Sequence, residues 1–140
     1  MSVDCEGNGP VNMLYMHGTA DTKVPWNGLS VKDTDGNPQL VTMSIHDSVN
    51  FWVDRNRCST EVNQMEIPPR DSSSLTRVKT FASTNCQTSA EVVLFAIIGG
   101  GHNWPGVAGF IPAPIAGGVN MDIHASDVIW SFFSAKQLDR

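Results

Sequence analysis

Two short polar segments carry the side chains that are best suited to acid–base chemistry. The first, HGTADTKVP at residues 17–25, contains Asp21 as its only carboxylate, and the second, GGGHNWPG at residues 99–106, contains His102. A carboxylate that accepts a hydrogen bond from the Nδ1 of an imidazole fixes the tautomer, which leaves Nε2 to remove a proton from a nucleophile. We therefore predict that Asp21 and His102 form such a pair.

Each of these segments follows an apolar run that predicts a buried strand. Val11–Met16 ends directly before the first segment, and Glu91–Ile98 is continuously apolar and β-branched after its first residue, as expected for a central strand covered on both faces. Glycines after both runs allow the chain to turn sharply. Open α/β sheets bind ligands at the carboxyl ends of their strands, so we expect both segments at one edge of a sheet.

The rest of the chain predicts a small open sheet of the α/β class with crossover connections, in a single domain over residues 1–140. The segment Ser59–Asn85, with Pro68-Pro69 and a run of serines, is expected to be a surface excursion that includes an edge strand. An exposed turn or hairpin tip is expected over Lys32–Gln39, and an edge strand over Leu75–Phe81. A first helix is expected from Thr42 or Ser44 to about Arg57, with one face formed by Ile45, Val49, Trp52 and Val53. A second helix is expected over Asp122–Lys136, with one stripe formed by Ile123, Val128, Ile129, Phe132 and Phe133.

Composition argues against several kinds of partner. The 140 residues carry a formal charge of −5 and a pI near 5.1, without any run of Lys and Arg, so a nucleic-acid partner is not expected. No apolar stretch approaches the roughly 20 residues that cross a bilayer, so no membrane partner is expected. The first residues also lack the basic and apolar regions of a signal peptide.

The three cysteines, Cys5, Cys58 and Cys86, show no CxxC spacing and have no histidine at a zinc-ligand spacing. This pattern favours neither a metal site nor a cofactor. Any two of the three could form a disulfide.

Six motifs, read in order, resemble one family. They are HGTADTKVP, a helix with Phe51-Trp52 that ends at Cys58, then Cys86, the strand EVVLFAI, GGGHNWPG and the closing HASDVIWSFF. Together they resemble the C-terminal half of the esterase and polyhydroxybutyrate depolymerase family of α/β-hydrolases, which includes feruloyl and acetyl xylan esterases. The resemblance covers nearly the whole chain and implies a partial α/β-hydrolase fold that lacks the half with the nucleophile elbow.

The resemblance implies a secreted carboxylic-ester hydrolase that acts on small or polymeric esters. Asp21 would orient His102, and His102 would act as base and then as acid for a serine located earlier in the chain. No serine here is framed as Gly-x-Ser-x-Gly, so the nucleophile would come from a missing N-terminal half, a second chain or an oligomer. The resemblance also favours a Cys58–Cys86 disulfide at the edges of a polar segment, with Cys5 unpaired.

Simpler roles are open for several side chains. Asp21 could only cap the turn after its strand, and a zinc site of His17, Asp21 and His102 is conceivable although no spacing requires it. Among the other histidines, we expect His17 to bond to the backbone near the site, and His46 and His124 to lie at the surface. Among the tryptophans, we expect Trp52 and Trp130 to pack on helix core stripes, and Trp26 and Trp104 to be walls of a substrate pocket.

A second hypothesis comes from a different class. The chain could be a non-catalytic remnant or half-domain whose bare sheet edge and apolar helix faces favour association. Both hypotheses predict a homo-oligomer or a missing half, because a strand that is central in the family would otherwise have an open edge.

Overall fold

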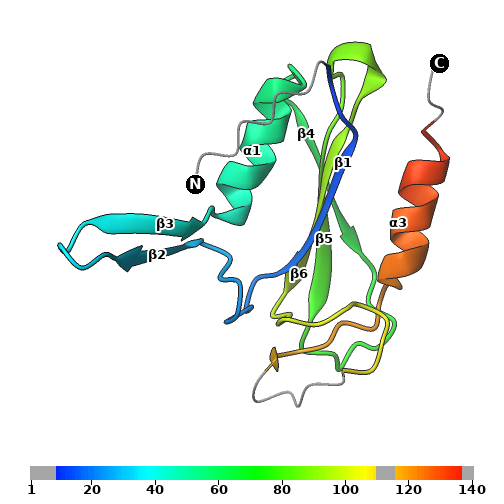
Figure 1. The fold of residues 1–140 in the computed structure, drawn as a ribbon. Coiled ribbons are helices and arrows are strands. Elements are labelled where there is room, and N and C mark those ends of the chain that lie inside the picture. Colours follow the sequence, from blue (N-terminus) through cyan, green and yellow to red (C-terminus); the bar gives the residue numbers. More distant parts are fainter. Residues whose placement is uncertain (1–8, 110–115, 137–140) are drawn as a thin grey trace.

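A mixed four-stranded β-sheet forms the centre of the computed structural model, which describes residues 9–109 and 116–136 (Figure 1). The elements around and within it are β1 (Met13–Gly18), β2 (Leu29–Lys32), β3 (Pro38–Thr42), α1 (Ile45–Arg55), β4 (Val62–Ile67), β5 (Arg77–Ser83), the 3-10 helix η1 (Gln87–Ser89), β6 (Val92–Ile98) and α3 (Ala125–Ser134). Across the sheet the order is β1, β6, β5, β4, and α1 and α3 cover opposite faces. Helices on both faces of a mixed sheet are compatible with the expected α/β class.

The apolar strand β6 lies in the interior of the sheet, as its sequence predicts. It pairs in parallel with β1 and antiparallel with β5. On one face its Leu94 packs with Ile45 of α1, and on the other its Ile97 packs with Val78 and Ile123. Because both faces of β6 are covered, the strand needs no alternation of polar and apolar residues.

The prediction of an edge strand over Leu75–Phe81 is wrong. The strand β5 lies between β6 and β4 and is antiparallel to both, and its Val78 is completely buried. The outer position belongs to β4, whose sequence VNQMEI is exposed along most of its length. The polar sequence of β4 gives no apolar pattern by which the strand could be predicted. An outermost strand can be stabilised by backbone pairing with its neighbour while its side chains remain in water.

The first helix is confirmed, and Ser44 is its N-cap. The Ser44 hydroxyl accepts a hydrogen bond from the Asp47 N–H at 3.0 Å and donates one to the Asp47 carboxylate, which together satisfy the start of the helix. The inner face of α1 buries Ile45 and partly buries Val49, which pack with Tyr15 and other residues of the sheet. The helix α1 therefore packs on the face of the sheet that is opposite to α3.

The closing helix α3 is also confirmed, but Trp130 does not pack in the core. It is 76% exposed, whereas Val128 packs against the buried cluster at the sheet. Successive residues of an α-helix are turned by about 100°, so the residue after Ile129 lies well away from the inner stripe. His124 precedes α3 as its N-cap and is exposed, as expected, and so is His46 on α1.

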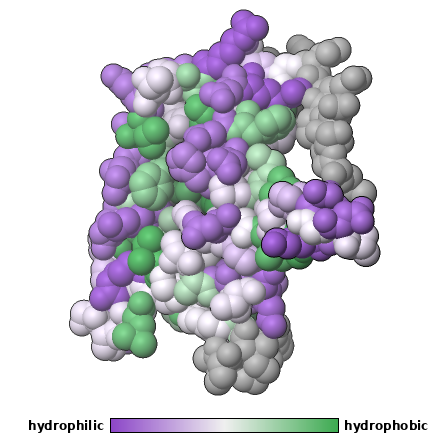
Figure 2. All heavy atoms as spheres, turned by 90° about the vertical axis from the view of Figure 1, so that its left-hand side faces the viewer, coloured by the Kyte–Doolittle hydropathy of each residue, from purple (hydrophilic) through white to green (hydrophobic). Residues whose placement is uncertain are grey.

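The strands β2 and β3 form a separate antiparallel hairpin that projects from the body beside α1 (Figure 1). Its turn contains Asp33–Asn37, within the hairpin tip expected from the sequence, and both strands are almost wholly exposed. On this side of the molecule the hydrophobic residues form separate patches among hydrophilic ones (Figure 2). The hairpin follows directly on the loop that carries Asp21.

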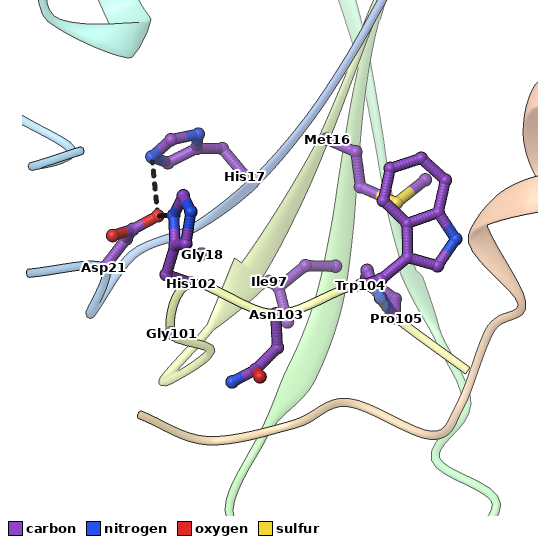
Figure 3. A pocket seen from close by; sticks show the side chains of 10 residues that line it. All are labelled: Met16, His17, Gly18, Asp21, Ile97, Gly101, His102, Asn103, Trp104 and Pro105. Atoms are coloured by element: carbon purple, nitrogen blue, oxygen red, sulfur yellow. Dashed lines mark hydrogen bonds and ion pairs between the residues drawn. The ribbon is translucent and has the colours of Figure 1, made fainter. Parts of the chain in front are cut away.

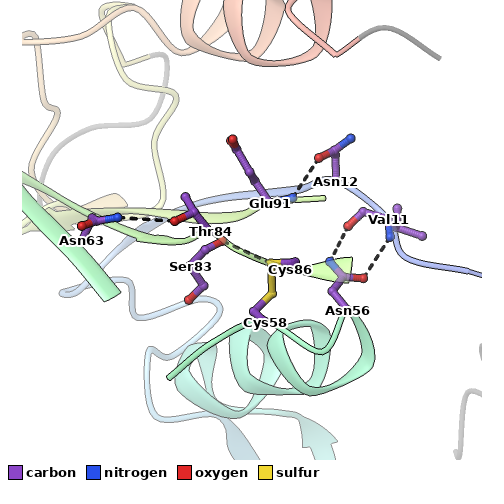
Figure 4. The surroundings of a disulfide bond; sticks show 9 residues. All are labelled: Val11, Asn12, Asn56, Cys58, Asn63, Ser83, Thr84, Cys86 and Glu91. Atoms are coloured by element: carbon purple, nitrogen blue, oxygen red, sulfur yellow. Dashed lines mark hydrogen bonds between the residues drawn. A yellow bond between two sulfur atoms is a disulfide. The ribbon is translucent and has the colours of Figure 1, made fainter. Parts of the chain in front are cut away.

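The disulfide Cys58–Cys86 joins the end of α1 to the segment that follows β5 (Figure 4). Beside it the fully buried Asn56 accepts a hydrogen bond from the Val11 N–H at 2.9 Å and donates one to the Val11 carbonyl at 2.7 Å. The disulfide agrees with the pairing that the family resemblance implies. Cys5 lies outside the described residues.

The outer edge of β1 is open in the part of the chain that the structure describes, where its only strand partner is β6. None of the helices in residues 9–109 and 116–136 has both the length and the apolar sequence needed to cross a bilayer.

Candidate active site

The carboxyl ends of β1 and β6 meet at one edge of the sheet and bring the two polar loops together. In the parallel register Gly18 stands opposite Ile97, so each loop leaves its strand at the same level. Asp21 and His102 are 81 residues apart in sequence, yet the Nδ1 of His102 lies 2.8 Å from Oδ2 of Asp21 (Figure 3). The predicted contact between the carboxylate and the imidazole is therefore present in the structure.

Asp21 is held in place by its own loop. Its side chain is 4% exposed, and its Oδ1 accepts hydrogen bonds from the backbone N–H groups of Lys23 at 2.8 Å and Val24 at 2.9 Å. Burial raises the pKa of the Asp21 carboxyl, but the hydrogen bonds from Val24, the His102 ring and Lys23 outweigh burial and lower the pKa below its usual value. Asp21 thus caps its turn and at the same time accepts a hydrogen bond from His102, so the turn cap and the predicted contact coexist.

His102 has the opposite environment, because its side chain is 48% exposed. The carboxylate of Asp21 can only accept a hydrogen bond, so the ring nitrogen facing it, Nδ1, carries the proton. Nε2 is then the nitrogen with a free lone pair. A ring with this tautomer and this exposure can accept a proton from a group that enters from solvent or from another polypeptide.

His17 lies on the other side of Asp21. Its Nε2 is 2.8 Å from the Val24 carbonyl, to which it donates, and 3.6 Å from Oδ2 of Asp21. This confirms the expected bond from His17 to the backbone of the loop. Because Nε2 carries that proton, the nitrogen facing Asp21 has no lone pair for a metal ion, and among the described residues no three His, Cys, Asp or Glu side chains are grouped as metal ligands.

The two loops approach each other backbone to backbone at Gly18. A Cβ atom at this position would lie 2.3 Å from the Gly100 oxygen and 2.6 Å from the Gly101 oxygen. Only glycine fits such an approach without a shift of the backbone. The glycine of the first motif therefore serves the contact between the loops.

A cavity of about 370 Å³ adjoins the pair (Figure 3). Its lining comes from the ends of β1 and β6 and from the His102 loop, and consists of Met16, His17, Gly18, Asp21, Ile97, Gly101, His102, Asn103, Trp104 and Pro105. This described lining contains neither a hydroxyl nor a thiol side chain. The described lining therefore offers an imidazole, a carboxylate and apolar walls, but no hydroxyl or thiol that could act as a nucleophile.

The two tryptophans that the sequence places in a substrate pocket lie in different surroundings. Trp104 lines the cavity, but it points toward Met16, on the side opposite the Asp21–His102 pair, so it does not wall the imidazole (Figure 3). Trp26 is absent from the lining and packs against the core beside Ile45 instead. Only Trp104 is thus positioned to contact a molecule bound in this cavity.

Sequence reasoning misses Asn103, the neighbour of His102. Its Nδ2 lies within 3.5 Å of three backbone carbonyls in the segment 116–118. An amide directly after the histidine in a glycine-rich loop is a weak signal for such a role. Its partners lie 13 to 15 residues further along the chain, and no pattern in the sequence marks them.

Comparisons with known proteins give one distant relative. The chain is 26% identical over 129 residues to a protein of Nocardia uniformis subsp. tsuyamanensis named "Putative esterase NocK". The match includes 89% of this chain and 37% of that protein, so the chain spans little more than a third of the relative's length. No family model matches the chain, and no solved structure matches it. The relationship that follows is esterase-like and distant.

Proposed function

We propose that this chain supplies the acid and the base of a serine-type carboxylic-ester hydrolase with an α/β-hydrolase fold. The observation that carries the proposal is the 2.8 Å contact between Nδ1 of His102 and Oδ2 of Asp21 at the carboxyl ends of two parallel strands. The similarity to a protein named as an esterase supports the same class. The preferred reaction is hydrolysis of acyl esters of polysaccharides, of hydroxyalkanoate polyesters or of small esters.

Each residue has a defined task in this reaction. Asp21 is ionised at neutral pH because its pKa is lowered, and it holds the Nδ1–H of His102. Nε2 of His102 takes the proton of a serine hydroxyl as the serine oxygen attacks the ester carbonyl, and then gives that proton to the departing alcohol. A water molecule repeats the sequence and releases the acid. The apolar walls, Met16, Ile97 and Trp104, accommodate carbon atoms of the ester.

The serine and the oxyanion hole come from polypeptide other than these 140 residues. The sequence holds no Gly-x-Ser-x-Gly, and the described lining of the cavity has no hydroxyl. The open edge of β1, the strand that leads to Asp21, offers backbone groups to a further strand. A strand that paired there in parallel would end beside the cavity, where a nucleophile is needed.

Hydrolysis of p-nitrophenyl acetate by the natural protein that carries this sequence tests the proposal. We expect His102→Ala to lower kcat by about 10⁴-fold or more and Asp21→Asn to lower it by about 10⁴-fold, since members of a triad act as a unit. His46→Ala is the matched control, because His46 is exposed on α1. Equal turnover by the two site variants and the control would end the assignment.

The second candidate is a non-catalytic half-domain that associates through its exposed surfaces. It is favoured by the open edge of β1 and by two aromatic side chains of α3, Trp130 at 76% and Phe133 at 47% exposed. It predicts a dimer or larger assembly of the chain with no ester turnover. A monomer in light scattering at micromolar concentration would contradict it.

The disulfide supports export from the cytoplasm. Structural disulfides persist in oxidising compartments, so the Cys58–Cys86 bond favours a secreted protein, as the family resemblance also implies.

A further inference from the structure

We propose that Asn103 is a positioning residue that holds His102 in reach of Asp21. The inference rests on the proposed function and adds a residue to it. Asn103 follows His102 directly, and its Nδ2 lies 3.3 Å from the Ala116 carbonyl, 3.1 Å from that of Gly117 and 3.4 Å from that of Gly118. The side chain of Asn103 thus contacts three successive backbone carbonyls next to His102.

The chemistry of these contacts requires an amide. All three partners are carbonyl oxygens, which can only accept, so the NH₂ group of Asn103 has to face them and its own oxygen has to point elsewhere. The two hydrogens of this NH₂ group are shared among the three carbonyl oxygens. An aspartate of the same shape would place a negatively charged oxygen against the three carbonyls and would turn attraction into repulsion.

The backbone beside Asn103 is tied to the same segment. The His102 N–H donates to the Ala116 carbonyl, and the Gly101 N–H donates to the Gly118 carbonyl at 2.9 Å. The fit is close, because a Cβ atom on Gly101 would lie 1.8 Å from the Ala116 oxygen. The direction in which the chain presents His102 is therefore set by its contact with residues 116–118.

The far side of this segment is anchored in the protein. Asn120, which is 1% exposed, donates to the Thr76 hydroxyl at 3.0 Å and to the Asp122 carboxylate at 2.8 Å. Asp122 in turn accepts the Arg70 N–H at 2.9 Å. Two residues beyond the carbonyls that Asn103 holds, the segment is thus tied by hydrogen bonds to the loop between β4 and β5.

His102 needs this support because few contacts of its own hold the ring in place. Half of the side chain faces solvent, and Trp104 points away from it. The hydrogen bond to Asp21 holds the ring only when the backbone places it within 3 Å of the carboxylate. We expect that removal of the Asn103 amide lets the loop move by a fraction of an ångström or more, which lowers the rate and leaves ester binding by the apolar walls intact.

The experiment compares Asn103→Ala and Asn103→Asp with the matched control Asn63→Ala in the natural protein that carries this sequence. Asn63 is an exposed amide on β4 whose side chain donates a hydrogen bond to the Thr84 hydroxyl at 3.5 Å. With p-nitrophenyl acetate we expect Asn103→Ala to lower kcat about 10- to 100-fold with little change in KM, and Asn103→Asp to lower it further. The control should match the unsubstituted protein.

A second readout does not depend on activity. In a ¹H–¹⁵N NMR spectrum the Nδ1–H proton of His102, hydrogen-bonded to Asp21, should give a low-field resonance that Asp21→Asn shifts or abolishes. We expect Asn103→Ala and Asn103→Asp to broaden or remove this resonance, while Asn63→Ala retains it. Far-UV circular dichroism and thermal unfolding check that each variant is folded.

The outcomes separate the two proposals. Loss of the resonance in both Asn103 variants, with no ester turnover even by the unsubstituted protein, would support the positioning role and refute the hydrolase. An unchanged resonance and an unchanged kcat in both variants would overturn the positioning role alone. So would the absence of the resonance from the unsubstituted protein, or global unfolding of both Asn103 variants.

Discussion

The two ends of the strand pair β1 and β6 are held together in contrasting ways. At the amino ends, near Val11, the chain uses a disulfide and the fully buried side chain of Asn56. At the carboxyl ends, near Gly18, backbone meets backbone, and two side chains bridge the loops. The half-exposed His102 bonds to Asp21, and the Thr19 hydroxyl accepts a hydrogen bond from the Gly99 N–H at 3.0 Å. The comparison teaches that stability and chemistry can occupy opposite ends of the same two strands.

The largest expected effect on stability lies at the amino end. Replacing both partners of the disulfide, as Cys58→Ser with Cys86→Ser, should lower the free energy of unfolding by about 3–4 kcal/mol, because the bond closes a loop across a sequence separation of 28 residues. Urea denaturation measures this loss. Ester turnover per folded molecule should stay the same, and a fall in turnover under conditions where the variant is fully folded would show that the two ends are coupled.

A smaller loss of stability, joined to a loss of activity, is expected at the carboxyl end. Gly18→Ala places a methyl group 2.3 Å from the Gly100 oxygen, so the loops have to separate, at a cost of about 1–3 kcal/mol. Turnover should fall as well, since Asp21 moves away from His102. Thr22→Ala, an exposed change in the same loop, is the control. If Gly18→Ala kept full turnover, the close approach would have no role in placing the pair.

The smallest expected effect is the dependence of stability on pH at Asp21. The pKa of its carboxyl is lower in the folded chain than its usual 3.8, so the ionised group stabilises the fold above about pH 4, and this contribution is lost as the pH falls through the folded-state pKa. The difference in the free energy of unfolding between the unsubstituted chain and Asp21→Asn should therefore be constant near neutral pH and shrink in acid.

Urea titrations at several pH values between 3 and 7 measure that difference. Other carboxyls with lowered pKa, such as Asp33 and Asp71, are present in both proteins and cancel in the subtraction. A difference that is independent of pH would mean that folding does not lower the pKa of Asp21, so its hydrogen bonds would do no more than offset burial.

What the sequence predicts correctly depends on local patterns. Three elements can be recognised from neighbouring residues alone, without knowledge of the fold. They are the apolar strand β6, the helix α1 with its apolar stripe, and the turn of the hairpin. The contact between Asp21 and His102 can be predicted because both follow strands and because ligands gather where such strands end.

What the sequence conceals depends on partners that are distant along the chain. The polar strand β4 is recognisable only through its pairing with β5, and the exposure of Trp130 depends on how α3 is turned against the sheet. Asn103 is an ordinary loop amide until the segment 116–118 is placed beside it. Residues whose function is to join two segments carry no periodic signal of their own.

The glycine contact at the mouth of β1 and β6 also limits how the cavity can diversify. Walls made of peptide groups offer no side chain to enlarge, shrink or recharge, and a methyl group at Gly18 already collides with the opposite loop. Under the proposed function, selection for another acyl or alcohol group would have to act on the few lining positions that carry apolar side chains, above all Met16, Ile97 and Trp104. Among homologous chains, the substrate range should vary with these three positions, while the glycines stay fixed.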